Sequence, residues 1–168
     1  MNKIELNTER MLGFGSYQNA NYLYGLDELC QKYIKNTDTI LELGTNDGIS
    51  SALFSFYAKK VYTIDLKSPS NRLKNILDNY KNITFLNGSF YKEIEKLNNK
   101  FEFIYIDGNH DYNSVVSDIK FCMNFLKNKI IGGHDFYDGD CDVKKAVMFC
   151  FPEKEIIRFS DSSWVVEL

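Results

Sequence analysis

A short segment near residue 45 has the composition of a ligand-binding turn. Residues 41–49 read Leu-Glu-Leu-Gly-Thr-Asn-Asp-Gly-Ile, so an apolar stretch with one acid, Glu42, runs directly into two glycines, Gly44 and Gly48. Glycine permits positive φ angles and a close approach of ligand to backbone, and the first amides of a following helix supply donors. The pattern predicts a turn that binds a nucleotide-like cofactor. Ordinary strand-to-helix turns can look the same, so a second signal is needed.

A second carboxylate supplies that signal. Residues 60–65 form an apolar strand that ends in Asp65. This acid follows the glycine turn by about twenty residues, where a residue that binds a ribose is expected.

The chain has two histidines, and each has an aspartate close by in the sequence. His110 comes three residues after Asp107, and His134 directly precedes Asp135. Imidazole titrates near neutrality, which makes His110 a natural general base. The alternative is a local role, in which His110 caps the next helix or hydrogen-bonds a neighbouring carboxylate.

The composition indicates one globular domain, residues 1–168. A chain of 168 residues with 44% hydrophobic residues can bury a sizeable core. The net charge of −3 and the absence of a basic stripe argue against extended contact with nucleic acid. The cysteines lack C-x-x-C spacing, residues 1–5 lack the apolar core of a signal peptide, and no run of about 18 apolar residues occurs. We therefore expect a cytoplasmic protein with reduced thiols and no membrane partner.

The elements alternate along the chain. Residues 1–20 are expected to form an irregular arm, 21–35 an N-terminal helix and 36–168 a cofactor-binding core. Strands are predicted at 39–43, 61–65, 83–86, 101–107 and 129–131, helices at 49–58, 69–80, 91–97, 112–126 and 143–149, and a hairpin at 155–159 and 164–167. Such alternation predicts an α/β fold with a doubly wound, mostly parallel, Rossmann-like sheet of seven strands, ending in an antiparallel hairpin. Ligands then gather at the carboxyl ends of the strands.

Residues 36–168 resemble the class I S-adenosylmethionine-dependent methyltransferases. The resemblance rests on the Glu42-to-Gly48 turn and on Asp65. Residues 105–112 (Tyr-Ile-Asp-Gly-Asn-His-Asp-Tyr) and 132–136 (Gly-Gly-His-Asp-Phe) are similar to the I-D-G-x-H-x-Y and H-D signatures of small-molecule and sugar O-methyltransferases. The resemblance implies S-adenosyl-L-methionine as cofactor. It assigns to the cofactor site Glu42, Gly44, Thr45, Asn46 and Gly48 at the methionine end, Asp65 at the ribose, Ser89 and Phe90 at the adenine, and Asp107. One departure is Asn46, which stands where the family has a glycine.

The resemblance also implies a catalytic role for His110 with Asp107, and a divalent metal, magnesium or manganese, held by Asp107, His134 and Asp135. His134 replaces the oxygen donor that related enzymes have there, and imidazole favours zinc, iron or manganese over magnesium. Asp138, Asp140 or Asp142 are further candidate ligands. The alternative is that Asp135 caps a helix, His134 lines the pocket and the three acids form a solvated loop.

These features predict an O-methyltransferase that acts on a hydroxyl of a small molecule, with a sugar or sugar-linked metabolite as one candidate. The chain is small, so residues 1–20 or a second protomer of a homodimer would complete the acceptor pocket. One alternative is an RNA ribose 2′-O-methyltransferase whose catalytic tetrad is loosely assembled from Asp107, Lys144 and Glu167. Another is a cofactor-binding pseudoenzyme that acts as a partner subunit, because a fold does not guarantee chemistry.

Overall fold

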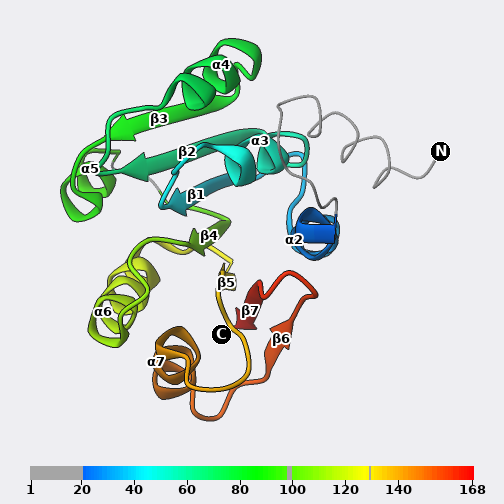
Figure 1. Ribbon diagram of the computed structural model, residues 1–168, viewed down its shortest axis with the longest axis vertical. Coiled ribbons are helices and arrows are strands. Elements are labelled where there is room, and N and C mark those ends of the chain that lie inside the picture. Colours follow the sequence, from blue (N-terminus) through cyan, green and yellow to red (C-terminus); the bar gives the residue numbers. More distant parts are fainter. Residues whose placement is uncertain (1–20, 98–99, 129) are drawn as a thin grey trace.

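The core of the protein is a seven-stranded sheet with the order β3-β2-β1-β4-β5-β7-β6. The computed structural model describes residues 21–97, 100–128 and 130–168, so the predicted arm at 1–20 lies outside the described residues. The strands are β1 Thr39–Leu43, β2 Lys60–Asp65, β3 Ile83–Asn87, β4 Phe103–Ile106, β5 Ile130–Gly133, β6 Ile156–Arg158 and β7 Trp164–Glu167. The first five pair in parallel, and β7 runs antiparallel to both of its neighbours (Figure 1). The predicted fold class is confirmed.

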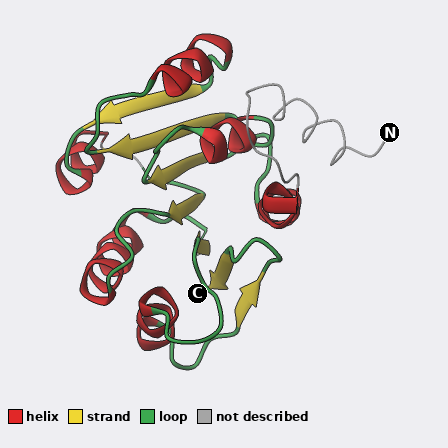
Figure 2. Cartoon of the chain, in the orientation of Figure 1, coloured by secondary structure: helices red, strands yellow, loops and turns green. Residues whose placement is uncertain are grey.

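Helices cover both faces of this sheet (Figure 2). They are α2 Asn21–Tyr33, α3 Ile49–Ser55, α4 Asn71–Asn79, α5 Phe90–Leu97, α6 Tyr112–Cys122 and α7 Asp142–Cys150, with a 3₁₀ turn at Met123–Phe125. Buried side chains of α2, α3 and α4 share one core cluster, and those of α5, α6 and α7 share the other. Alternate residues of β4 point into the two clusters, because a parallel sheet in this fold is buried on both faces. No helix in the described ranges has the length and apolar character to cross a bilayer.

Some helix boundaries differ from the prediction for local reasons. The predicted helix at 69–80 places Pro69 in its first turn, but Ser70 is the N-cap and its hydroxyl accepts a hydrogen bond from Leu73 N (3.1 Å). Pro69 therefore precedes the helix. The helix predicted to reach residue 58 ends at Ser55, whose hydroxyl bonds back to Ala52 O (2.6 Å), a local bond that competes with further helix. The helix predicted over 112–126 ends at Cys122 and tightens into the 3₁₀ turn.

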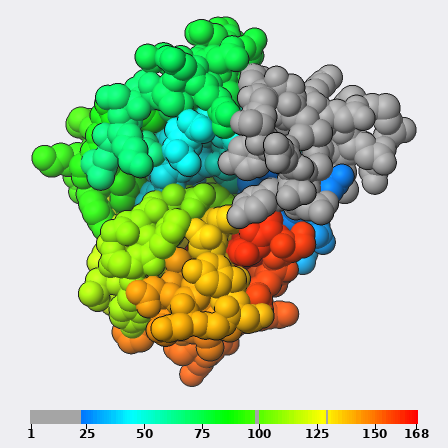
Figure 3. Space-filling model, in the orientation of Figure 1, coloured from blue at the N-terminus to red at the C-terminus, as the bar shows by residue number. Residues whose placement is uncertain are grey.

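The C-terminal hairpin is part of the main sheet. Its second strand, β7, lies between β5 and β6, with Trp164 paired to Gly133. A side chain at residue 133 would come within 2.8 Å of the Trp164 ring, so glycine lets this fully buried ring pack on β5. Figure 3 shows α6, α7 and the hairpin gathered in one half of the molecule. The hairpin thereby reaches the end of β5, where His134 and Asp135 follow.

Candidate active site

Two adjoining cavities lie where the carboxyl ends of β1, β2, β4 and β5 meet. The larger has a volume of about 710 Å³ and is lined by the turn after β1, the ends of β2 and β3, and the loop after β4. The smaller has a volume of about 120 Å³ and extends from the same turn toward α2 and the hairpin. Gly44, Asn46 and Asp107 line both cavities. The larger is within the usual size range of small-molecule sites.

The glycine turn has the backbone that its sequence predicts. Gly44 has φ +87°, and a Cβ at this position would overlap the carbonyl oxygen of Asp107. The turn after β1 therefore lies directly against the loop after β4, which only glycine permits. Asn46, at the position of the missing glycine, also has a positive φ of +46°, a conformation that asparagine adopts more readily than most residues.

Asp65 connects this turn to β2. Its Oδ2 accepts hydrogen bonds from the backbone N–H groups of Thr45 (3.0 Å) and Asn46 (2.9 Å), and its Oδ1 accepts one from Lys67 N (2.8 Å). Asp65 lines the larger cavity, as do Ser89 and Phe90 from the segment after β3. These three predicted cofactor residues thus lie on one wall, and their contact with a cofactor stays a prediction.

Glu42 is fully buried behind the turn and does not line either cavity. Its carboxylate accepts hydrogen bonds from the hydroxyls of Ser50, Ser51 and Thr63, the last at 2.7 Å. Because Thr63 donates to Glu42, the 2.6 Å contact between the Thr45 and Thr63 hydroxyls makes Thr45 the donor to Thr63. Burial raises the pKa of Glu42 to about 7, although the three hydroxyl donors oppose that shift. Glu42 therefore supports the turn from inside the protein.

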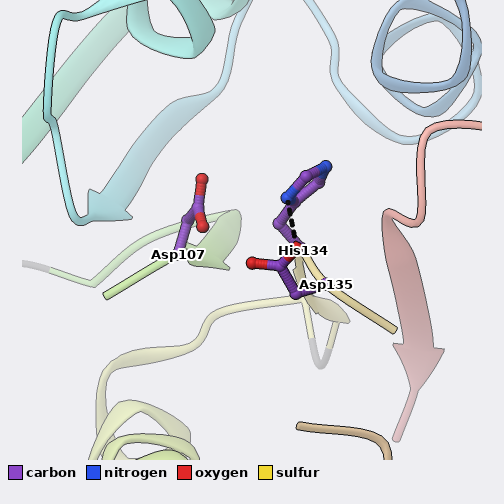
Figure 4. A group of neighbouring side chains, drawn as sticks. All are labelled: Asp107, His134 and Asp135. Atoms are coloured by element: carbon purple, nitrogen blue, oxygen red, sulfur yellow. Dashed lines mark ion pairs between the residues drawn. The ribbon is translucent and has the colours of Figure 1, made fainter. Parts of the chain in front are cut away.

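Two histidines and two aspartates meet beside the cavities. Nε2 of His110 lies 3.4 Å from Asp107 Oδ1 and 3.2 Å from Asp135 Oδ2, so this imidazole contacts both carboxylates. Nδ1 of His134 lies 3.4 Å from Asp135 Oδ1 (Figure 4). The bond to Asp107 raises the pKa of His110 above its ordinary value, against the effect of partial burial. Burial lowers the pKa of His134, but Asp135, Asp107 and Asp161 outweigh this and raise it to about 9.

Three of these residues lie close enough together to be ligands of one metal ion. One ligand atom from each of Asp107, His134 and Asp135 lies within 4.8 Å of the other two. Figure 4 shows Asp107 after β4 and the other two after β5, on neighbouring strand ends. The further candidates Asp138, Asp140 and Asp142 are not brought into this group. All three are exposed and form ion pairs with lysine or arginine; Asp138 and Asp140 lie in a loop, as the solvated-loop alternative predicts, whereas Asp142 begins α7.

The capping alternatives are wrong. The N-cap of α6 is Asp111, which accepts a hydrogen bond from Ser114 N (3.0 Å), so His110 does not cap the helix. The N-cap of α7 is Cys141, not Asp135. The thiol of Cys141 contacts the carbonyl oxygen of Asp135 (3.0 Å) and so supports this residue, whose φ is +60°.

The tetrad required by the RNA alternative is not assembled. Glu167 pairs with Ile130 at the start of β5, whereas Asp107 follows the end of the parallel β4. The two acids therefore lie at opposite ends of the strands. Lys144 is ion-paired with Asp138 (3.0 Å).

The structure adds one acid to the site that the sequence reasoning did not single out. Asp161 lies in the four-residue connection of the hairpin, 160–163, which has the composition of a solvated turn. Its side chain is only 1% exposed and lines the smaller cavity with His134 and Tyr105. Nothing in the local sequence distinguishes Asp161 from a surface turn residue.

Comparison with known proteins identifies the family. A family model described as a methyltransferase domain matches residues 41–136, more than half of the chain. The chain therefore belongs to this family, and its fold is that of the class I enzymes. The match confirms the methyltransferase class that the sequence motifs predicted. A search of curated proteins finds no significant sequence match.

Solved structures agree on the fold. A Streptococcus mutans methyltransferase solved with S-adenosylhomocysteine superposes with a TM-score of 0.66 at 15% identity, covering 84% of this chain and 94% of that one. A Bacillus cereus O-methyltransferase, also solved with S-adenosylhomocysteine, gives 0.63 at 12% identity, with 97% and 91% covered. A structure described as an rRNA methylase, from Clostridium thermocellum, gives 0.64 at 13%, with 83% and 92% covered. The chain spans 47% of two longer methyltransferase structures. At these identities the similarity establishes the fold alone.

Proposed function

We propose that this methyltransferase transfers the methyl group to a hydroxyl of a small molecule, with sugars and sugar-linked metabolites as the first class to test. The observation that supports this most is the meeting of the two cavities at Asp107, beside His110 and Asp135. The cofactor's nucleoside fits the larger cavity, with Asp65 at the ribose and Ser89 and Phe90 at the adenine. Its methionine end fits the smaller cavity, beside Gly44, Thr45 and Asn46.

Methyl transfer requires positioning and a base. A hydroxyl oxygen attacks the methyl carbon in line with the bond to sulfur, the new C–O bond forms, and the C–S bond breaks to release S-adenosylhomocysteine. In this proposal the neutral imidazole of His110 takes the hydroxyl proton. His110 is 53% exposed on its side chain, so an acceptor can reach it from solvent.

The same site suits a divalent metal. Asp107, His134 and Asp135 offer two carboxylates and one imidazole within 4.8 Å of one another, a donor set compatible with manganese. A bound ion would lower the pKa of the acceptor hydroxyl and help to orient it. The polar residues around this point, including Asn109 and His110, favour a hydroxyl-rich acceptor over an apolar one.

The test combines binding with turnover. S-adenosylmethionine is titrated calorimetrically, and methyl transfer is then screened over sugars, nucleotide-linked sugars and phenols, with and without Mn²⁺. We expect turnover on a hydroxylated compound, and its loss in His110→Asn with cofactor binding retained. Cofactor binding without turnover on any acceptor would instead favour the pseudoenzyme alternative. Turnover on RNA, with binding that weakens steeply with salt, would favour the RNA alternative.

A further inference from the structure

Asp161 places a buried negative charge on the wall of the smaller cavity. Its Oδ1 accepts a hydrogen bond from Ser163 N (3.0 Å) and its Oδ2 accepts one from the Ser163 hydroxyl (2.8 Å). Each carboxylate oxygen can accept two hydrogen bonds, and these are the only two that Asp161 accepts from side chains or backbone in the described ranges. A carboxylate buried to this degree is costly unless a cation or further donors compensate it.

Within the described ranges, Asp161 has no lysine or arginine partner. Its nearest cationic group there is the His134 imidazole, with Nε2 at 4.0 Å from Asp161 Oδ2, beyond hydrogen-bond distance. The two other carboxylates on this cavity are already engaged. Asp47 pairs with Arg72 (3.1 Å), and Asp107 contacts His110 (3.4 Å). Asp161 is therefore the acid on this wall that is best placed to receive a small cation.

The surrounding structure holds Asp161 in this position. The Tyr105 hydroxyl contacts the Ser163 hydroxyl at 2.8 Å, and because Ser163 donates to Asp161, Tyr105 is the donor to Ser163. On the other side, α2 packs its backbone against the acid at Gly25, where a Cβ would overlap the Asp161 carboxylate. Leu23 and Leu26 of α2 complete this wall. The carboxylate is thus fixed by three elements that are far apart in the sequence.

We propose that Asp161 binds the α-ammonium group of the cofactor's methionine end. This inference rests on the proposed placement of the nucleoside in the larger cavity, which leaves the amino-acid end in the smaller one. An ammonium group is a compact cation with three donors, which suits a buried carboxylate on the cavity wall such as Asp161. The acid of the glycine turn, Glu42, does not line this cavity, because its carboxylate is buried behind the turn. In this proposal the connection of the hairpin, through Asp161, therefore supplies the negative charge that binds the ammonium group.

The experiment compares three ligands by calorimetry on the full chain. S-adenosylhomocysteine carries the ammonium, its deaminated analogue keeps the carboxylate but lacks the ammonium, and 5′-methylthioadenosine lacks the amino-acid end. We expect wild type to bind the deaminated analogue about 10- to 100-fold more weakly than S-adenosylhomocysteine, the effect of losing a charge-assisted hydrogen bond. In Asp161→Asn that difference should fall below about 3-fold, with 5′-methylthioadenosine affinity unchanged. Asp47→Asn, a matched change on the same cavity, should keep the wild-type difference.

The outcomes separate this inference from the proposed placement of the cofactor. Equal wild-type affinity for S-adenosylhomocysteine and its deaminated analogue overturns the role of Asp161, whether or not the variant folds. A difference that survives in Asp161→Asn also overturns it. A wild-type protein that binds none of the three ligands overturns the cofactor placement, and this inference with it.

Discussion

The indole Nε1 of Trp164 donates a hydrogen bond to the backbone carbonyl of His134 at 3.2 Å, and so joins the C-terminal hairpin to the loop that carries the candidate metal ligands. A second hydrogen bond joins the same two segments, because Phe136 N in the loop donates to Ser162 O in the hairpin connection at 2.9 Å. The positions of His134 and Asp135 therefore depend on a strand that lies about thirty residues further along the chain.

Replacing Trp164 by phenylalanine should destabilise the protein and loosen this loop. The change leaves a void in a fully buried position and removes the donor to His134 O, which together should lower the free energy of unfolding by about 1–3 kcal/mol. Denaturant unfolding measures the change. Phe149→Leu, at a ring that is 58% exposed, should change stability by less than about 0.5 kcal/mol. Equal effects of the two substitutions would argue against the structural role of Trp164.

Glu42 should make stability fall as pH rises. Burial raises its pKa from 4.5 to about 7, so between these values the folded state binds more protons than the unfolded state. The free energy of unfolding should therefore decrease from pH 4.5 to above 7, by up to about 3 kcal/mol from this group. Because His134, with its pKa raised from 6.5 to about 9, adds a decrease only above pH 6.5, the part between pH 4.5 and 6.5 should disappear in Glu42→Gln. Glu153→Gln, at an exposed position, should keep it. Parallel pH curves for wild type and Glu42→Gln would contradict the assignment.

The rate of methyl transfer should rise with pH if His110 is the base. Only neutral imidazole can take a proton, and the bond to Asp107 keeps the pKa of His110 above 6.5, so the midpoint of the rise should lie above 6.5. His110→Gln should lower kcat by about 10²- to 10⁴-fold and leave S-adenosylhomocysteine affinity unchanged. A variant with an unaltered pH profile would exclude His110 as the base.

Metal binding should depend on Asp135. Asparagine tolerates the positive φ of +60° at this position, so Asp135→Asn should fold normally while it removes one charged ligand. We expect the affinity for Mn²⁺, measured by calorimetry without cofactor, to fall at least about 10-fold. Asp140→Asn, at an exposed acid paired with Lys145, is the matched control and should bind Mn²⁺ as wild type does. If wild type binds no Mn²⁺, the metal proposal fails and His110 acts without an ion.

Local sequence patterns were sufficient to predict the family, the alternating elements and the acids at the ends of β1, β2, β4 and β5. Strand patterns, the glycine turn and the spacing of Asp65 depend on neighbours within a few residues, which a sequence displays directly. The tertiary structure alone decided which carboxylates face the cavities. Glu42 lies behind the turn, because three hydroxyl groups from α3 and β2 surround it. Asp161, in a segment that resembles a surface turn, lies on the cavity wall, because β7 inserts beside β5 and α2 packs over the connection at Gly25. Such placements depend on contacts between residues far apart in the chain, and no local pattern records them.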